Sequence, residues 1–415
     1  MLMLKQTDSQ VYKILKAEEK RQRETLMMIP SENHSSWAVR QAVGSCLQDK
    51  YCEGYPGKRY YQGQENFDKI ETLCQERAKK LFRVQCVNVQ ALSGGPANSA
   101  VYFGLLNPGD KIMGLKLDQG GHISHGLNIN FSGKFYETCF YYVNQAGFID
   151  YEKLSEIARK EKPKIIIAGI TAYPRKLDFA KFAKIANSIN AYLMADIAHV
   201  AGLVIAGVYP NPAHYADIIT TTTHKTLRGP RGALIMVTKK GLAKDPDLPK
   251  KIDRAVFPGL QGGPHMNNIA GIAVALKEAS KASFKKYCRQ IVENAEILAQ
   301  SLKKHGFNLC SDGTDTHLIL IDLRNFKISG KQVAINLEKA GIITNYNAVP
   351  YDPNPLFNPS GLRLGTPGIT SRGIAGPQMR QIAGFIARVI KNREIKQVRG
   401  EVKKLCRKFP IKREY

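Results

Sequence analysis

The sequence predicts an α/β fold, with a mostly parallel central sheet in a large domain and a smaller α+β domain after it. In the middle of the chain, strand-like apolar segments alternate with helical segments. Several of these segments are unbroken apolar runs, which is typical of a parallel sheet covered on both faces. The C-terminal part instead contains long helical stretches and fewer strands. Strands are expected at residues 111–115, 164–170, 191–196, 217–220 and 233–237.

The helices are predicted from their apolar spacing. A first helix is expected to end near Glu24, because Pro30 and the polar residues after it break the pattern. Residues 64–82 form an amphipathic helix with Phe67, Ile70, Leu73, Cys74 and Leu81 on one face. A long helical stretch follows between Asn267 and His305.

The C-terminal part adds one clear strand and one clear helix. Residues 317–323 predict a strand, and the chain is expected to end in a basic helix with Ile382, Phe385, Ile386, Val389 and Ile390 on its apolar face. Three regions follow from this order of elements. They are an N-terminal arm at 1–50, a large α/β domain at 51–280 and a small α+β domain at 281–415.

Composition narrows the class of protein. The chain has 415 residues, of which 43% are hydrophobic, so it can bury a large core without disulfides or metals. No apolar segment is long enough to cross a membrane, and the N-terminus does not resemble a signal peptide. The eight cysteines form no C-x-x-C pair. We therefore expect a soluble cytoplasmic protein without a metal site, although Cys310, Asp312 and His317 permit a thiol site as a weaker reading.

The net charge of +26 is far from neutral. Such a charge attracts polyanions, whether nucleic acid, an anionic membrane surface or an acidic substrate. Part of the excess lies in residues 388–415, where eleven Lys and Arg stand against three Glu. A solvated basic face is the simpler interpretation, and a nucleic-acid-binding protein remains an alternative.

The strongest chemical signal is the stretch Thr220-Thr-Thr-Thr-His224-Lys225-Thr-Leu-Arg-Gly-Pro-Arg231-Gly. A lysine that follows a strand of a parallel sheet lies at the edge where α/β folds bind their ligands. Partial burial favours the neutral amine, which is the form that makes a Schiff base. By itself, a lysine after a strand is usually an ordinary surface residue.

Two weaker signals precede it. Asp196 ends an apolar strand and needs a partner there, such as a protonated pyridine nitrogen, and His199 follows within reach of the same ligand. Taken alone, the pair is also compatible with a hydrogen-bonded aspartate and a core histidine. The stretch Ser93-Gly94-Gly95-Pro96-Ala97-Asn98 lies between a strand and a helix, where backbone N–H groups bind phosphate.

Together these three signals have the order found in fold-type I pyridoxal-phosphate enzymes, which have an aspartate aminotransferase-like fold. Nearly the whole chain resembles the serine (glycine) hydroxymethyltransferase family. The resemblance rests on the stretches Pro30–Asn33, Lys50–Tyr61, Gly120–His122, Ala172–Arg175, Asp196–Gly202, Thr220–Gly232, Val256–Pro264 and Leu362–Pro367.

The resemblance implies a reaction and its participants. Serine and tetrahydrofolate would be converted reversibly to glycine and 5,10-methylenetetrahydrofolate through a pyridoxal 5'-phosphate Schiff base. Tetrahydrofolate is then a co-substrate, and the protein is a homodimer with sites shared across the interface.

Residue roles follow from the same resemblance, position by position. His122 stacks on the cofactor ring, Thr171 and His199 lie near its phenolic oxygen, and Glu53 transfers protons. Catalytic roles are implied for Lys225, Glu53, His224, Asp196 and Thr222. Cofactor contacts are implied for Ser93, Gly94, Gly95, His122, Thr171, Asp196, His199, His224, Lys225, Tyr51 and Gly263. Substrate contacts are implied for Ser31, Tyr61, Arg363 and Glu53, and folate contacts for Leu117, Gly121 and Asn347. The family places Tyr51 and Glu53 in the neighbouring subunit's site.

Three positions depart from the family pattern. Gly95 stands where a serine is usual, Thr171 replaces a serine, and Gln62 replaces a glycine. None removes a central catalytic group, but Gly95 removes a hydroxyl donor to the phosphate. One enzymatic alternative remains, a folate-independent aldolase that acts on L-threonine or L-allo-threonine. Glu53, Tyr60, Tyr61 and Asn347 argue against it, because an aldolase does not need the folate surface.

Overall fold

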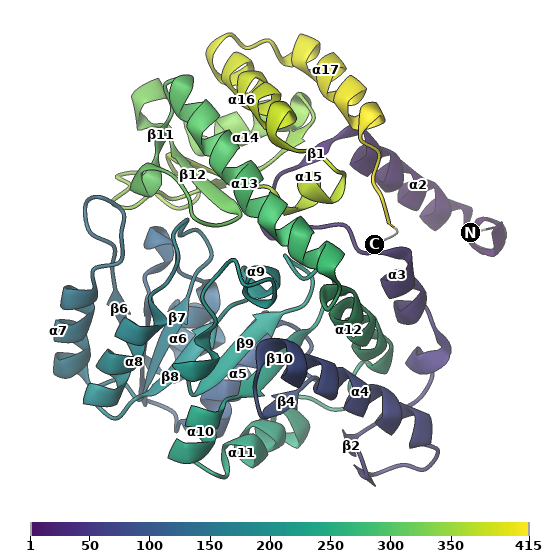
Figure 1. The fold of residues 1–415 in the computed structure, drawn as a ribbon, viewed down its shortest axis with the longest axis vertical. Coiled ribbons are helices and arrows are strands. Elements are labelled where there is room, and N and C mark those ends of the chain that lie inside the picture. The colour runs from purple at the N-terminus through teal and green to yellow at the C-terminus, as the bar shows by residue number, and fades with distance from the viewer. Residues whose placement is uncertain (1, 414–415) are drawn as a thin grey trace.

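The computed structural model describes residues 2–413 and places them in two packed parts (Figure 1). The first part contains a seven-stranded sheet in the order β4-β10-β9-β8-β7-β5-β6. Its strands are β4 Cys86–Asn88, β5 Lys111–Leu115, β6 Glu137–Tyr141, β7 Ile165–Gly169, β8 Tyr192–Asp196, β9 Ile218–Thr222 and β10 Ala233–Val237. The five expected strands are all present, and the predicted α/β class is confirmed.

Alternate residues of these strands enter two different cores, which explains their unbroken apolar character. Ile165 and Ile167 of β7 lie in one core with the helices α5 and α11. Ile166 and Ala168 point to the other face and lie in the core that α4, α8 and α12 cover. Helices on both faces leave no solvated side for polar residues. The covering helices are α4 Glu65–Phe82, α5 Gly94–Leu105, α6 Phe131–Phe135, α7 Tyr151–Glu161, α8 Phe179–Ser188, α9 Ala201–Ile205, α10 Lys239–Lys244, α11 Leu248–Arg254 and α12 Met266–Ala279.

Strand β10 runs antiparallel to β9, unlike its neighbours β5 to β9, which are parallel. The loop of residues 223–232 joins β9 to β10. A parallel connection needs about a dozen residues or more, usually a helix, so this short loop only reverses the chain. The reversal matters for function, because this loop carries Lys225 at the end of β9.

The second part of the molecule is built on a four-stranded antiparallel sheet in the order β11-β12-β15-β14. Its strands are β11 Asn308–Leu309, β12 Leu318–Asp322, β14 Asn345–Asn347 and β15 Gly361–Gly365, with β13 Ile342–Ile343 nearby. Its helices are α13 Ala282–Lys304, α14 Gly330–Lys339, α15 Pro367–Ser371, α16 Gly376–Lys391 and α17 Ile395–Lys408.

Two helix predictions need correction. The stretch from Asn267 to His305 is two helices, α12 and α13, separated at Ser280 and Lys281. Helix α13 contributes Ile291 to the first core and Leu298 to the core of the second part, so it connects them. The basic helix α16 carries the expected apolar face, but α17 follows it and packs Val398 and Val402 into the same core.

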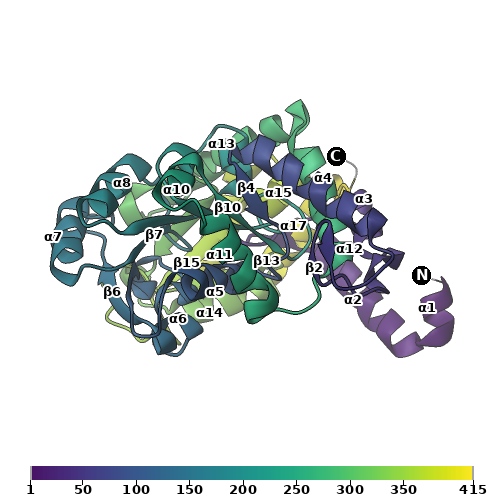
Figure 2. The same cartoon turned by 90° about the horizontal axis from the view of Figure 1, so that it is seen from below.

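The N-terminal region is divided between exposed and buried segments. Helices α1 Leu2–Thr7 and α2 Ser9–Glu24 contain no buried residue and extend away from the body (Figure 2). Strand β1 Leu26–Met27 then pairs in parallel with β13, and Leu26 and Met28 enter the core of the second part. The remaining elements are α3 Trp37–Val43, β2 Gly54–Tyr55 and β3 Lys58–Arg59. The division at 1–50, 51–280 and 281–415 stays a prediction.

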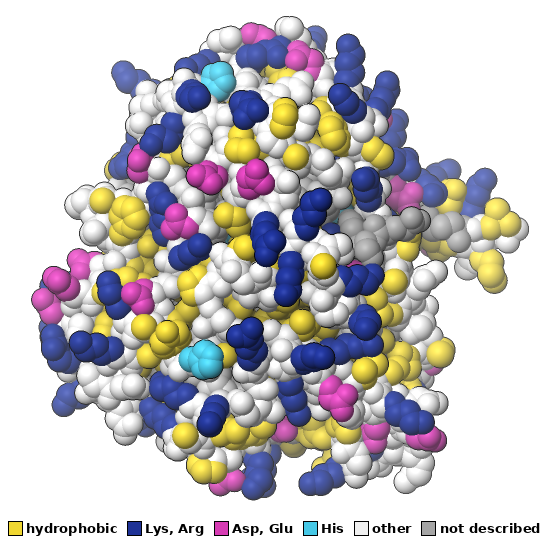
Figure 3. Space-filling model, viewed as in Figure 1, with side chains coloured by type: hydrophobic (Ala, Val, Ile, Leu, Met, Phe, Trp, Pro, Cys, Tyr) yellow, Lys and Arg dark blue, Asp and Glu magenta, His cyan; other side chains and the backbone are white. Residues whose placement is uncertain are grey.

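Lysine and arginine side chains are spread widely over the face shown in Figure 3, where they outnumber acidic side chains. The last helix, α17, carries six basic residues and a single acidic residue, Glu401. Its basic residues are Lys396, Arg399, Lys403, Lys404, Arg407 and Lys408. Within residues 2–413, no helix has the length and apolar character that crossing a bilayer requires.

Candidate active site

A cavity of about 490 Å³ lies at the carboxyl edge of the central sheet, where the second part of the molecule meets it. This is the edge where open α/β sheets bind ligands. Asp196 ends β8, Thr222 ends β9, and Lys225 follows on the next loop. The lining residues are Ser31, Glu32, Ser93, Gly94, Gly95, Pro96, Asn98, His122, Ile123, Ile170, Thr171, Asp196, Ala198, His199, Thr222, His224, Lys225, Arg231 and Arg363.

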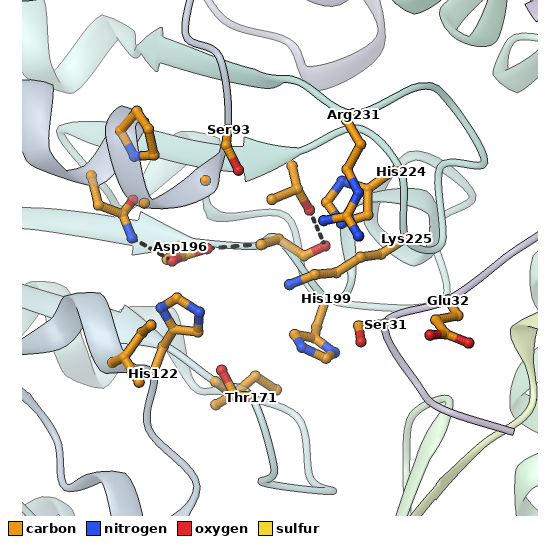
Figure 4. Close-up of a pocket in the computed structure, with 18 of the residues that line it drawn as sticks. Ser31, Glu32, Ser93, His122, Thr171, Asp196, His199, His224, Lys225 and Arg231 are labelled. Atoms are coloured by element: carbon orange, nitrogen blue, oxygen red, sulfur yellow. Dashed lines mark hydrogen bonds between the residues drawn. The ribbon is translucent and has the colours of Figure 1, made fainter. Parts of the chain in front are cut away.

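The Lys225 side chain extends into this cavity toward Asp196 (Figure 4). Its backbone carbonyl accepts a hydrogen bond from Nδ2 of Asn33 at 3.0 Å, which fixes the loop. Burial lowers the pKa of Lys225 to about 8, and the nearby Asp196 carboxylate opposes this shift while the guanidinium groups of Arg363 and Arg231 add to it. A substantial fraction of the amine is therefore neutral near physiological pH, as a nucleophilic lysine requires.

Asp196 is held as an anion by three donors. Its Oδ2 accepts from Nδ2 of Asn98 and lies 2.9 Å from Nε2 of His125, while Oδ1 accepts from the backbone N–H of Ala198 at 3.0 Å. Burial alone would raise the pKa of Asp196, but the hydrogen bond and charge of His125 outweigh burial and hold it well below its usual range. A buried carboxylate of this kind can keep a pyridine nitrogen protonated.

His122 is a neutral ring at the cavity wall. Its Nδ1 lies 2.7 Å from Oγ of Ser124 and accepts the Ser124 backbone N–H at 3.2 Å. Burial lowers the pKa of His122 to about 4, with a smaller contribution from His125. The uncharged imidazole therefore offers a flat face to an aromatic ligand.

The turn before α5 forms the anion-binding end of the cavity. Ser93 is the N-cap of α5, yet its side chain makes no capping hydrogen bond, so the hydroxyl is available to a ligand. A Cβ on Gly94 would lie 2.7 Å from Cγ2 of Thr222, whereas a Cβ on Gly95 would meet nothing within 4 Å. Gly94 is therefore required by packing, and Gly95 leaves open space beside the helix N-terminus. Such a terminus favours negative charge.

Arg363 reaches the cavity from β15 of the second sheet. Its Nε donates to Oδ1 of Asn345 at 3.0 Å and its Nη1 donates to the backbone carbonyl of Thr171 at 2.8 Å. Burial lowers the pKa of Arg363 to about 10, which still leaves a cation at neutral pH. These two contacts orient the guanidinium and leave Nη2 without a partner among residues 2–413, so it can bind a carboxylate.

A second contact between the two parts lies beside it. Nδ1 of His199 is 3.3 Å from Nε2 of His317, and the two rings stack with centroids 5.5 Å apart. Burial lowers the pKa of His317 to about 3 and that of His199 well below its usual value. Both rings are therefore neutral, and one donates to the other.

These residues fit pyridoxal phosphate. The cavity offers an amine with a lowered pKa, a buried carboxylate, a neutral aromatic wall and a helix N-terminus. Nδ1 of His224 is also buried without a hydrogen-bond partner in the described part of the chain, as expected where a ligand supplies one. Among residues 2–413 no group of three or more His, Cys, Asp or Glu side chains is arranged to hold a metal.

Comparison with known proteins agrees with this geometry. Residues 4–386 match the family described as serine hydroxymethyltransferase. The chain belongs to that family. Proteins named serine hydroxymethyltransferase from Desulfotalea psychrophila and Acidothermus cellulolyticus are each 51% identical to it, over 99% and 97% of this chain and 96% of theirs. A third, from Sorangium cellulosum, is 48% identical over 98% of this chain and 96% of its own length.

Four family positions predicted for the site lie outside the cavity of this chain. Tyr51, Glu53, Tyr61 and Gly263 are not among its lining residues. They gather elsewhere: the rings of Tyr51 and Tyr61 are 5.9 Å apart, and a Cβ on Gly263 would lie 3.3 Å from Tyr51 and 3.8 Å from Glu53. Tyr51 is 66% exposed. Within one chain, the structure does not bring this group to Lys225.

The three predicted folate contacts are only partly brought together. Leu117 lines a second cavity of about 320 Å³ that shares His122 with the first. Gly121 and Asn347 do not line it. A Cβ on Gly121 would lie 1.9 Å from the Leu115 carbonyl, so this glycine is required by the backbone path, and Asn347 donates to the carbonyl of Ala348 at 2.7 Å. Folate roles for these residues stay a prediction.

The thiol site considered from the sequence is wrong. Asp312 binds Lys303 at 2.5 Å on the surface, and His317 faces His199 instead of Cys310. Burial raises the pKa of Cys310 to about 12, which makes its thiol unreactive. The three residues are close in sequence, but the turn after β11 points them in different directions.

Sequence reasoning missed several residues that complete the cavity. His125 and Asn98 bind Asp196, Asn345 orients Arg363, and His317 contacts His199. Asn98 lies in the predicted phosphate-binding stretch and Arg231 in the stretch around Lys225. The sequence therefore indicated where they lie but not what they do. Nothing in the sequence marks His125 or Asn345, because their partners lie far away in the chain.

Proposed function

We propose that this chain converts L-serine and tetrahydrofolate reversibly to glycine and 5,10-methylenetetrahydrofolate, using pyridoxal 5'-phosphate bound through Lys225. One observation supports this most directly. The buried Lys225 amine shares a single cavity with the Asp196 carboxylate and the Arg363 guanidinium. Membership of the family and the names of the similar proteins support the same reaction.

The residues that hold the cofactor follow from their chemistry. Lys225, Asp196 and His122 all line the cavity. Lys225 would form the covalent link, Asp196 would pair with the ring nitrogen, and His122 would offer its flat face to the ring. Ser93 and the backbone N–H groups at the start of α5 bind the phosphate. Thr171 and His199 lie on the cavity wall as partners for the phenolic oxygen. The bound cofactor supplies an electron sink that stabilises a carbanion at Cα while the Cα–Cβ bond breaks.

The other residues bind substrate and place protons. Arg363 binds the substrate carboxylate through the unpaired Nη2, and Ser31 lies on the same wall. The Lys225 amine, whose pKa is lowered by burial, would serve as a base in the same cavity when it is not bonded to the cofactor. His224 and Thr222 line the cavity wall next to Lys225. In this position they restrict the access of water and orient the Lys225 amine. The neutral state of His199 and His122 adds no further positive charge to a cavity that already holds Arg363 and Arg231.

The functional unit in this proposal is a dimer. Tyr51, Glu53, Tyr61 and Gly263 serve the site of a second copy of the chain, where Glu53 handles the proton of the serine hydroxyl. The exposure of Tyr51 and Tyr61 supports this assignment, as does the absence of all four residues from the lining of their own cavity. A C2 pair would place two such clusters into two cavities by symmetry.

The apolar cavity that shares His122 with the cofactor site is the proposed folate site. Leu117, Leu127 and Phe140 line it and suit a flat aromatic ring. Its position beside the cofactor site would let folate capture the one-carbon unit as it leaves serine. We also propose that the protein acts in the cytoplasm, which the eight unpaired cysteines support.

Two measurements test the function. Serine cleavage by the purified protein should depend on tetrahydrofolate, whereas equal rates with and without it would indicate a folate-independent aldolase. Borohydride reduction followed by mass mapping should label Lys225 alone. Lys225→Ala should abolish the label and the activity, and Lys244→Ala is the matched control, because burial also lowers the pKa of Lys244. A pyridoxyl group on another lysine would overturn the assignment.

A further inference from the structure

Arg59 ties the segment that carries Glu53 to the protein interior. Nη1 of Arg59 donates to the backbone carbonyl of Cys52 at 3.1 Å and to that of Gly54 at 2.8 Å. These are the two carbonyls on either side of Glu53. Although this segment lies at the surface, the Arg59 side chain is only 3% exposed.

The guanidinium is anchored in turn by helix α4. Its Nη2 lies 2.6 Å from Oε2 of Glu71, whose side chain is fully buried, and its Nε lies 2.8 Å from Oδ1 of Asp68. Asp68 also accepts the backbone N–H of Gly57 at 2.8 Å. One planar group thus connects the Glu53 segment to two carboxylates of a helix that packs in the main core.

Gln90, which follows β4, provides a second tie. Its Nε2 donates to the carbonyl of Gly54 and to Oε1 of Glu71, both at 2.9 Å. The carbonyl of Gly54 therefore receives two donors, and Glu71 binds both of them. Gly54 itself needs to be glycine, because its φ is +93° and a Cβ would lie 2.3 Å from the Lys58 carbonyl.

This network is a costly way to hold a short hairpin. Removing two charges from water costs free energy that their attraction often fails to repay, and apolar residues of similar volume are commonly as stable. An apolar contact does not fix the direction of a peptide group, whereas a forked guanidinium does. The arrangement therefore favours a role in geometry over a role in stability.

We infer that Arg59, supported by Glu71 and Gln90, is a positioning unit that sets the orientation of Glu53 and so controls the folate-dependent step. The inference rests on the proposed function, in which Glu53 transfers a proton. None of the three residues lines the cavity of its own chain. They act by fixing the carbonyls of Cys52 and Gly54, the residues before and after Glu53. Such fixing matters because a displacement of about 1 Å at a reacting group can cost about 100-fold in rate.

The test uses the holoenzyme and two substrates. Arg59→Lys keeps the charge but cannot bind four acceptors in one plane. We expect it to lower kcat for folate-dependent serine cleavage by about 10- to 100-fold, with the KM for serine changed by less than about twofold, because Arg363 and Ser31 are untouched. Cleavage of a bulky β-hydroxy amino acid without folate should stay near the wild-type rate in Arg59→Lys. In the control variant Arg388→Lys, both this reaction and folate-dependent serine cleavage should stay near the wild-type rate. Arg388 is the matched control, because it also binds two glutamates, Glu394 and Glu401, but in the second part of the molecule.

A double-mutant cycle separates positioning from general damage. Glu53→Gln should nearly eliminate folate-dependent turnover and spare the folate-free reaction. Adding Arg59→Lys to Glu53→Gln should then cause a further loss below about twofold, because both changes act through the same group. If the rate loss of the double variant equals the product of the losses of the two single variants, Arg59 acts independently of Glu53 and the inference is overturned.

A third variant keeps the test valid if Arg59→Lys folds poorly. Gln90→Met keeps the Arg59–Glu71 ion pair but removes the Gln90 donor to Gly54 and to Glu71, and it should lower folate-dependent kcat selectively as well. Equal loss of both activities in Gln90→Met, or no loss in a folded Arg59→Lys protein, would overturn the inference and leave the proposed function intact. Full activity of Glu53→Gln would instead contradict the proposed role of Glu53, and the positioning role would fail with it.

Discussion

The reactivity of Lys225 depends on where its amine is buried. The Nζ atom lies in a cavity that is also lined by two acidic side chains, Glu32 and Asp196, and by the guanidinium groups of Arg363 and Arg231. Of the two acidic groups, Asp196 is the one that acts on the pKa of Lys225. Asp196 is already bound by three donors, so it stabilises a charged lysine less than a free carboxylate would. Burial therefore prevails and lowers the pKa of Lys225 to about 8. Because other residues hold Asp196 as an anion, this carboxylate is also better suited to pair with the ring nitrogen of the cofactor.

This pKa predicts how stability varies with pH in the protein without its cofactor. The pKa falls from 10.5 to about 8 on folding, so between these values the unfolded chain binds one proton more than the folded chain. The free energy of unfolding should therefore rise with pH across that range, by about 3 kcal/mol from this group. Lys225→Met removes the effect. In urea titrations we expect the variant to be more stable than the wild type at pH 7 and the difference to shrink toward pH 10. A constant difference would contradict the burial of a charged amine.

At the scale of elements, the phosphate-binding end is made by one helix N-terminus and one strand end. Helix α5 approaches β9 closely enough that Gly94 has no room for a Cβ against Thr222. The next residue, Gly95, faces open space. The two glycines of this turn thus have different effects. Gly94 allows the close approach of α5 to β9, whereas Gly95 leaves open space at the position where the family pattern has a serine hydroxyl.

Gly95→Ser should tighten cofactor binding. A hydrogen bond to a charged group contributes about 1.5–3 kcal/mol, which corresponds to roughly a tenfold to hundredfold lower Kd. Turnover with excess cofactor should hardly change, because Lys225 still forms the covalent link. Titration of the cofactor-free protein measures the Kd. Gly94→Ala is the control and should weaken binding, since its Cβ meets Thr222. If Gly95→Ser binds no more tightly, water or another side chain already supplies the donor.

At the scale of the whole molecule, the catalytic set is split between two surfaces of the chain. Lys225, Asp196 and Arg363 share the cavity, whereas exposed Tyr51 and half-buried Glu53 lie in a separate cluster. Mixing inactive Glu53→Gln and inactive Lys225→Ala chains should recover about a quarter of wild-type activity, because half of the dimers are hybrids with one intact site each. Native mass spectrometry confirms that subunits have exchanged. No recovery in exchanged dimers would place Glu53 and Lys225 in the same chain's site.

The net charge of +26 is also a property of the whole molecule. Basic side chains are spread over the surface and dominate α17 (Figure 3). A field of this kind should favour folates with polyglutamate tails, and salt should reduce the preference. At low salt we expect a folate with five glutamates to bind more tightly than a folate with one. Equal binding would show that the charge serves another purpose, and a steep salt dependence of RNA or DNA binding would favour the nucleic-acid alternative.

The sequence by itself determined the class of fold and the order of the chemical signals. Both are local: an unbroken apolar run such as Ile165–Gly169 needs no partner to be recognised as a strand buried on both faces, and the stretch around Lys225 carries its own signature. The break between α12 and α13 and the reversal of β10 were less visible, because each depends on how a short connection closes in space.

Only the tertiary structure decided which side chains share a site. His125 binds Asp196, Arg363 binds the carbonyl of Thr171, and Arg59 binds Glu71 across distances along the chain that no periodic pattern records. Backbone periodicity reports which face of an element is buried, because burial depends on apolar area. It does not report direction, and hydrogen bonds and ion pairs depend on direction. The sequence was therefore enough to identify Lys225. The surroundings that lower its pKa, and the contacts of Arg59 next to Glu53, became visible only in the folded structure.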